Sequence, residues 1–196
     1  VHFIEKKGFD QYFVVEGANE QTMSQFEMLN YFRSLIKKGN MIVQKYIETR
    51  TKAGNPFDIR SHMMKDMQKV WSKVNVYPRI GINYAAISST SNGGYIGGLE
   101  GFIEANYNDY QSKEIVSQIQ KISLLFAEKF ESLYPDYLIS ELALDLAIDK
   151  EGNIQLIEIN VNKPGIIYYE FDVARHAIPY CISLAKESKV EEKSNK

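Results

Sequence analysis

The densest apolar patterning of the chain lies in residues 137–165, and it predicts a two-stranded hairpin. Over residues 138–148, leucine and isoleucine alternate with smaller or acidic residues, which is the period of a β-strand. The run IQLIEIN at 154–160 predicts the partner strand, with these residues sharing one face: Ile154, Leu156, Glu158 and Asn160. Residues 149–153 predict the turn between them, with Gly152 available for a positive φ. A hairpin so rich in apolar residues is expected to be buried on both sides.

Hydrophobic periodicity elsewhere predicts further strands and three helices. The strands are expected at 1–6, 11–16, 41–47, 57–66, 69–77 and 79–88. The helices are expected between Thr22 and Gly39, over 112–134 and over 169–188. Residues 89–98, STSNGGYIGG, are expected to form a glycine-rich loop.

Two of these helices carry one apolar stripe each, as expected of helices that pack on a sheet. In the first helix, Thr22 and Gln25 have the spacing of a capping box, and the stripe is Phe26, Leu29, Phe32 and Ile36. In the second helix, the stripe is Ile115, Ile119, Ile122, Phe126, Phe130 and Leu133. The order of elements favours an α+β fold, with a mostly antiparallel sheet and flanking helices, over a doubly wound parallel sheet.

Composition limits the function classes. The 196 residues allow one domain or two small lobes around one site, and a net charge of −2 argues against a general nucleic-acid binder. The single cysteine, Cys181, excludes an internal disulfide and is expected to be a small buried residue of a helix. The sequence shows no signal peptide and no apolar run of about 18 residues, so a cytoplasmic location without a membrane partner is expected.

Oxygen-bearing side chains interrupt both strands of the predicted hairpin. Asp145 lies on the first strand, and Glu158 and Asn160 lie on the second. Buried carboxylates normally imply a partner, and Mg²⁺ is usually held by one or two carboxylates together with phosphates. The sequence therefore predicts a magnesium site here, with an ordinary hairpin whose acids are solvated as the alternative.

Cationic and amide side chains supply a second half to this predicted site. Arg60 lies on the strand at 57–66, Arg79 begins a later strand, Asn92 lies in the glycine-rich loop and Lys163 follows the hairpin. If the strands are neighbours, the cations face the acids, an arrangement that suits phosphoryl transfer. The alternative for Asp58, Arg60 and His62 is a solvent-facing strand with a salt bridge.

Established phosphate-binding and nucleophile motifs are absent from the sequence. No GK[ST] follows the glycine-rich loop, as a P-loop would require, and no G-x-G-x-x-G or G-x-S-x-G pattern occurs. The glycine pairs at 93–94 and 97–98 could cradle an anion, or could simply form a hairpin tip.

The chain resembles an ATP-grasp domain, most closely the YheC/YheD group associated with bacterial endospore coats. The resemblance covers most of residues 1–185 and rests on I-V-Q-K-Y-I (42–47), P-F-D-I-R (56–60), Trp71 ahead of Arg79, S-N-G-G-Y-I-G-G (91–98), A-L-D-L (143–146) and I-E-I-N-V-N-K-P-G (157–165). It implies a glutathione synthetase ATP-binding domain-like fold. Residues 1–47 would be the remainder of the N-terminal lobe with its hinge strand, 48–188 the C-terminal lobe, and 189–196 a frayed tail.

The resemblance also implies roles for residues. The backbone of Lys45 and Ile47 would bind adenine, with Gln44 and Tyr46 lining the slot. The cations Arg60 and Arg79 would face the γ-phosphate and the acyl phosphate, and Asn92 and Lys163 would lie near the phosphates or substrate. The Mg²⁺ ligands would be Asp145, Glu158 and Asn160.

The implied activity is an ATP- and Mg²⁺-dependent ligase that joins a small carboxylate to an amine or a thiol through an acyl phosphate. Such enzymes carry a lysine strand and a glycine-rich phosphate flap before the hinge, and nothing before residue 41 matches them. We therefore expect an N-terminally truncated domain that binds nucleotide weakly and does not turn over. A non-catalytic nucleotide-binding or spore-coat structural protein that keeps the fold is the alternative.

Overall fold

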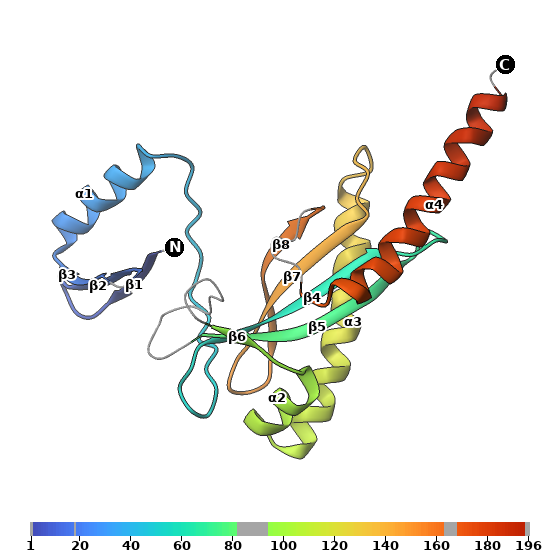
Figure 1. Cartoon of the computed structure of the whole chain (residues 1–196). Coiled ribbons are helices and arrows are strands. Elements are labelled where there is room, and N and C mark those ends of the chain that lie inside the picture. The colour runs from blue at the N-terminus through green and yellow to red at the C-terminus, as the bar shows by residue number, and fades with distance from the viewer. Residues whose placement is uncertain (1, 18, 82–93, 163–167, 195–196) are drawn as a thin grey trace.

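The computed structural model describes residues 2–17, 19–81, 94–162 and 168–194. The strands are β1 (His2–Lys6), β2 (Tyr12–Glu16), β3 (Asn19–Met23), β4 (Phe57–Lys65), β5 (Trp71–Ile80), β6 (Tyr95–Ile96), β7 (Glu141–Ile148) and β8 (Ile154–Val161). The helices are α1 (Gln25–Ile36), α2 (Leu99–Asn106), α3 (Asp109–Leu133) and α4 (Glu170–Ser194). The strands form two sheets, ordered β1-β2-β3 and β6-β5-β4-β7-β8, in which all neighbours are antiparallel (Figure 1). The expected α+β class with a mostly antiparallel sheet is confirmed.

The first helix begins two residues later than the sequence suggested. Ser24, not Thr22, is the N-cap, and Ser24 and Glu27 form the reciprocal capping box. The expected stripe is also wrong, because Phe26 and Ile36 are 71% and 65% exposed, whereas Met28 and Leu35 are buried. The helix therefore buries a different face from the one predicted.

The segment at 41–47 is not a strand, which corrects the sequence prediction. No ladder pairs it with a described strand, and Ile42 and Val43 are 92% and 79% exposed. An apolar run becomes a strand only where a neighbour supplies backbone partners. Here the run connects α1 to β4 as irregular chain, and Tyr46 contacts Phe3 of β1 with ring centroids 4.8 Å apart.

The central strands lie where the pattern placed them, with one boundary error. β5 continues through residues 71–80, so the break expected between 77 and 79 does not exist. The sequence prediction for 82–88 lies outside the described residues. One helix and two strands were missed altogether: α2, β3 and the two-residue strand β6.

A β-bulge in the β7–β8 hairpin changes which residues share a face. Leu146 pairs with Leu156, but Asp145 pairs with Glu158, so Ile157 is the extra residue on β8. Because side chains alternate along a strand, this extra residue moves Glu158 to the face opposite Leu156. The expectation that Ile154, Leu156, Glu158 and Asn160 share one face is therefore wrong. The apolar pair joins the core, and the polar pair shares the face of Asp145.

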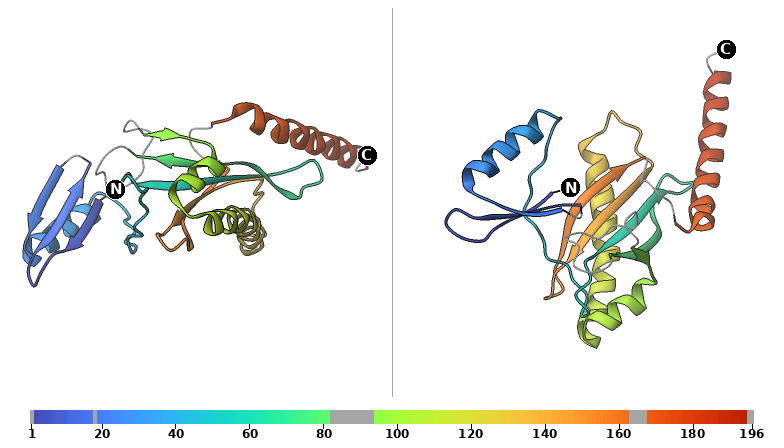
Figure 2. Two further views of the ribbon diagram at one scale, coloured as in Figure 1. Left: turned by 90° about the horizontal axis from the view of Figure 1, so that it is seen from below. Right: turned by 60° about the vertical axis from the view of Figure 1, so that its left-hand side comes forward.

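The helices cover both faces of the five-stranded sheet (Figure 2). α2 and α3 pack on its apolar face, where Ile115 and Ile119 of α3 join a core that includes Phe57 and Leu144. Of the stripe predicted for α3, Leu133 is the exception, being 59% exposed. The start of α4 contacts β4 and β5 on the opposite, polar face. α4 then projects from the sheet and runs to Ser194, beyond its expected end at 188.

Cys181 lies exposed on α4, which corrects the expectation of a buried residue. No helix in the described part of the chain is long and apolar enough to span a membrane.

Tyr107, just after α2, anchors the turn of the β7–β8 hairpin. Its hydroxyl donates to the carbonyl oxygens of Asp149, at 3.2 Å, and Ile148, at 3.4 Å. The turn itself is closed by the Asp149 carboxylate, which accepts from the backbone N–H groups of Glu151 and Asn153. Gly152 adopts a φ of 89°, as the sequence predicted. Burial, and then the Asp149 charge, raises the pKa of Tyr107 to about 12.

This pKa predicts a loss of stability at alkaline pH. In the unfolded chain a tyrosine ionises near pH 10, whereas folded Tyr107 keeps its proton to about pH 12. Between these values the unfolded state binds fewer protons, so the free energy of unfolding falls as pH rises, by about 2–3 kcal/mol. Urea denaturation from pH 9 to pH 11.5 should show this fall in the wild type and a smaller fall in Tyr107→Phe. Parallel curves for the two proteins would contradict the assignment.

Candidate functional site

The polar face of the five-stranded sheet carries ordered rows of side chains. Strand register places Tyr77, Arg60, Asp145 and Glu158 in one row across β5, β4, β7 and β8. The next row contains Asn75, His62, Ala143 and Asn160. Rows lie about 7 Å apart along a strand. The register therefore places five residues that the sequence analysis singled out on one face of the sheet: Arg60, His62, Asp145, Glu158 and Asn160.

Asp145 is the centre of the first row. Its two carboxylate oxygens accept from Arg60, with Nε at 2.6 Å and Nη2 at 2.9 Å. Arg79 Nη2 lies 2.9 Å from the same carboxylate. Arg79 also binds Asp58 in a bidentate pair, at 2.7 and 2.8 Å. Arg60 and Asp145 are only 7% and 5% exposed, so these are buried, charge-assisted bonds.

The environment of this cluster shifts two pKa values. Burial lowers the pKa of Arg79, but hydrogen bonds and attraction from Asp58 and Asp145 outweigh burial, and the net pKa is raised. Burial raises the pKa of Tyr77, because burial disfavours the charged phenolate, and the nearby charges of Arg60 and Arg79 oppose that rise. The Arg79 guanidinium and the Tyr77 phenol therefore keep their protons across the physiological range.

The two arginines lie against Asp145 rather than across a gap from it. The sequence suggested cations on one wall and acids on another. The structure brings Arg60, Arg79 and Asp145 into direct contact. Asn92 and Lys163, the other predicted phosphate contacts, lie outside the described residues.

Asp145, Glu158 and Asn160 share one face of β7–β8 because of the bulge. Glu158 is exposed, and the Asn160 Nδ2 atom is buried without a hydrogen-bond partner in the described chain. A buried N–H donor without an acceptor is costly and suggests that an acceptor such as a phosphate oxygen completes the site. Within the residues described, no group of three or more His, Cys, Asp or Glu side chains could hold a metal. Two carboxylates with one amide nevertheless fit Mg²⁺ that is also bound to phosphates.

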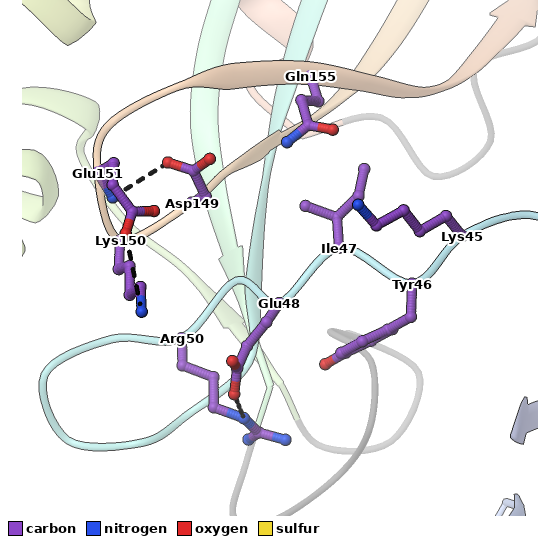
Figure 3. A pocket seen from close by; sticks show the side chains of 9 residues that line it. All are labelled: Lys45, Tyr46, Ile47, Glu48, Arg50, Asp149, Lys150, Glu151 and Gln155. Carbon is purple, nitrogen blue, oxygen red and sulfur yellow. Dashed lines mark hydrogen bonds and ion pairs between the residues drawn. The ribbon is translucent and has the colours of Figure 1, made fainter. Parts of the chain in front are cut away.

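A pocket of about 410 Å³ lies between the 45–48 segment and the β7–β8 hairpin. Its lining residues are Lys45, Tyr46, Ile47, Glu48, Arg50, Asp149, Lys150, Glu151 and Gln155 (Figure 3). Three of the four predicted adenine-slot residues therefore line it, whereas Gln44 is exposed and does not. Burial raises the pKa of Tyr46, against the influence of nearby Arg50.

Gln155 connects the pocket to the row of Asp145. Its register partner is Ala147, two residues from Asp145, so Gln155 and Glu158 both lie on the polar face of β8. The pocket and the oxygen-bearing row are thus neighbours on one surface, about one row apart. Sequence reasoning missed Gln155, and only the bulge shows that it shares a face with Glu158.

Sequence reasoning also undervalued His62. It is 3% exposed, and its Nε2 atom lies 2.7 Å from the Glu141 carboxylate. The sequence placed His62 on the face of Arg60, but the buried pair with Glu141 depends on β4 pairing with β7, which no local pattern specifies.

Comparison with known proteins supports the same fold. The family model described as YheC/D like ATP-grasp matches residues 1–184. Over 155 residues the chain is 26% identical to the endospore coat-associated protein YheC of Bacillus subtilis (strain 168). That match covers 76% of this chain and 40% of the relative, so the chain spans well under half of that protein. A family match over nearly the whole length shows that this chain belongs to the YheC/D-like ATP-grasp family.

Proposed function

We propose that this chain is the nucleotide- and Mg²⁺-binding part of a ligase that joins a carboxylate to an amine or a thiol. Membership of the ATP-grasp family gives a fold that generally binds ATP with Mg²⁺. The observation that carries the proposal is the continuity between the 45–48 pocket and the row of Asp145 on β7–β8. A nucleotide with its base in the pocket would extend its phosphates along that face.

The reaction we propose has two steps. A substrate carboxylate oxygen attacks the γ-phosphorus of ATP, the bond to ADP breaks, and an acyl phosphate forms. The amine or thiol then attacks the acyl carbon, and phosphate leaves with the electron pair of the broken C–O bond. The protein orients the reactants and neutralises charge, and it needs no covalent intermediate of its own.

Each part of the site has a role in this proposal. Asp145, Glu158 and Asn160 would hold Mg²⁺, which neutralises phosphate charge when bound. Lys45, Tyr46 and Ile47 would line the adenine slot, while Gln44 flanks it on the same segment. Asn92 and Lys163 would contact phosphate or substrate. We propose Arg60 as the residue that orients Asp145, and Arg79 as the cation that is better placed for phosphate because it is less buried.

A second candidate is a non-catalytic protein that keeps the ATP-grasp fold in a spore coat. Two observations favour it: the relative is described as endospore coat-associated, and Arg60 and Arg79 are paired with carboxylates of the protein itself. The Asn160 Nδ2 atom, which has no partner among the described residues, and the oxygen-bearing row favour the enzyme, since a structural role does not require either.

Glu158→Gln tests the metal site. Because Glu158 is exposed, the variant should keep its melting temperature, and its affinity for ATP in the presence of Mg²⁺ should fall by at least about tenfold, which is about 1.4 kcal/mol. Isothermal titration of the full-length protein with ATP, with and without Mg²⁺, measures this. Glu128→Gln, an exposed change on α3, is the matched control and should bind like the wild type.

Two results would count against the metal site. One is ATP binding by the wild type that does not depend on Mg²⁺. The other is a Glu158→Gln variant that unfolds, because the acid would then be mainly structural.

Arg60→Met tests whether the buried cation holds Asp145 in place. Removing one partner of a buried ion pair leaves a carboxylate short of hydrogen bonds and should cost about 3–5 kcal/mol of unfolding free energy. Urea denaturation measures this, with the 80%-exposed Arg175→Met as the control, which should change stability by less than about 0.5 kcal/mol. The double variant Arg60→Met/Asp145→Leu should recover part of the loss. A loss below about 1 kcal/mol in Arg60→Met would show that Asp145 does not depend on Arg60.

A further inference from the structure

The 45–48 pocket contains many charged side chains, but most of them are already engaged. Asp149 accepts from Glu151 N–H, Asn153 N–H and the Asn153 side chain, which lowers its pKa in spite of partial burial. Glu48 lies 3.7 Å from Arg50, and Lys150 lies 3.7 Å from Glu151. These groups line the rim of the pocket and the hairpin turn, and their charged atoms interact with one another.

Gln155 differs from the other lining residues. It is exposed to the pocket and has no hydrogen-bond partner among the described residues. Its amide carries both a donor and an acceptor, whereas Lys45 carries donors alone and Ile47 is apolar. Tyr46 also lines the pocket, and its hydroxyl can donate and accept, but it lies on the 45–48 segment. Gln155 is the lining residue with a planar side-chain amide, and it faces that segment from β8.

The position of Gln155 suits contact with a flat ligand. Figure 3 shows its amide directed from β8 toward Ile47, on the side of the pocket opposite the 45–48 backbone. Its neighbour across the sheet is Ala147, a small residue that leaves the long side chain room to move. A planar base held by the backbone of 45–47 would present its opposite edge to this amide.

We propose that Gln155 reads the nucleobase and selects adenine over guanine. This inference rests on the proposed function of the site. A glutamine amide matches the N6 amino group and N7 of adenine, one donor and one acceptor, with two hydrogen bonds. Guanine and hypoxanthine present acceptors at both O6 and N7, so one of the two bonds is lost. A bidentate match of this kind discriminates by about 5- to 150-fold.

The experiment measures the affinities of ATP, GTP and ITP, each with Mg²⁺, for the full-length protein. Titration calorimetry is performed on the wild type, on Gln155→Leu and, as a second variant of smaller volume, on Gln155→Ser. ITP has oxygen at position 6 and a proton on N1, as GTP does, but lacks the 2-amino group of GTP, so it separates contacts at position 6 and N1 from contacts at position 2. Gln118→Leu, on α3 where the half-buried glutamine bonds to Glu114 and does not line the pocket, is the matched control.

The expected result is a wild-type preference for ATP over both GTP and ITP of at least about fivefold, reduced toward one in both Gln155 variants and unchanged in Gln118→Leu. Three results would overturn the inference: wild-type selectivity that survives in both Gln155 variants, selectivity lost in Lys45→Ala instead, or rejection of GTP with acceptance of ITP, which would place discrimination at the 2-amino group. Absence of binding by all three nucleotides would overturn the proposed function as well, which separates the two failures.

Discussion

The site depends on one buried carboxylate. Asp145 lies in the middle of the five-stranded sheet, 5% exposed, and its oxygens accept from two guanidinium groups. An isolated charge at this depth would be too costly to retain, and the paired arginines make its burial possible. The arginines in turn are fixed because Asp58 holds Arg79. The resulting network joins β5, β4 and β7, and it sets the charge of the face on which Glu158 and Asn160 also lie.

The bulge in the hairpin determines which other groups join that face. Without the bulge at Ile157, Glu158 and Asn160 would lie on the same face of β8 as Ile154 and Leu156. With it, Ile154 and Leu156 reach the core while Glu158 and Asn160 reach the polar face. One strand thus contributes both to stability and to the candidate site. Bulges are frequent beside functional sites for this reason.

Local sequence patterns predicted the elements whose apolar residues recur with a clear strand or helix period. The β7–β8 hairpin, its turn at Gly152, β4 and the long helix α3 are strongly periodic, and the structure contains all of them. The apolar run at 41–47 was misread as a strand because strand formation requires a partner, which a local window does not show. The buried face of α1 was predicted wrongly because apolar residues lie on more than one side of this helix. The apolar pattern alone therefore does not show which side packs against the rest of the protein.

The candidate site was predicted in its residue types but not in its contacts. Motifs indicated Arg60, Arg79, Asp145, Glu158 and Asn160, and strand register brings all of these to one side of the sheet. Their direct pairing, the burial of His62 against Glu141 and the position of Gln155 follow from strand order and a bulge. Such features arise from pairings between residues tens of positions apart, so no short motif encodes them.

The central claim is that the pocket at 45–48 and the row of Asp145 form one nucleotide site. A crystal structure of the full-length protein with Mg²⁺ and a non-hydrolysable ATP analogue is the decisive measurement. We expect the base beside Ile47 and Gln155, and the metal on oxygens of Asp145, Glu158 and Asn160. A nucleotide bound elsewhere, or a metal held by other residues, would contradict it.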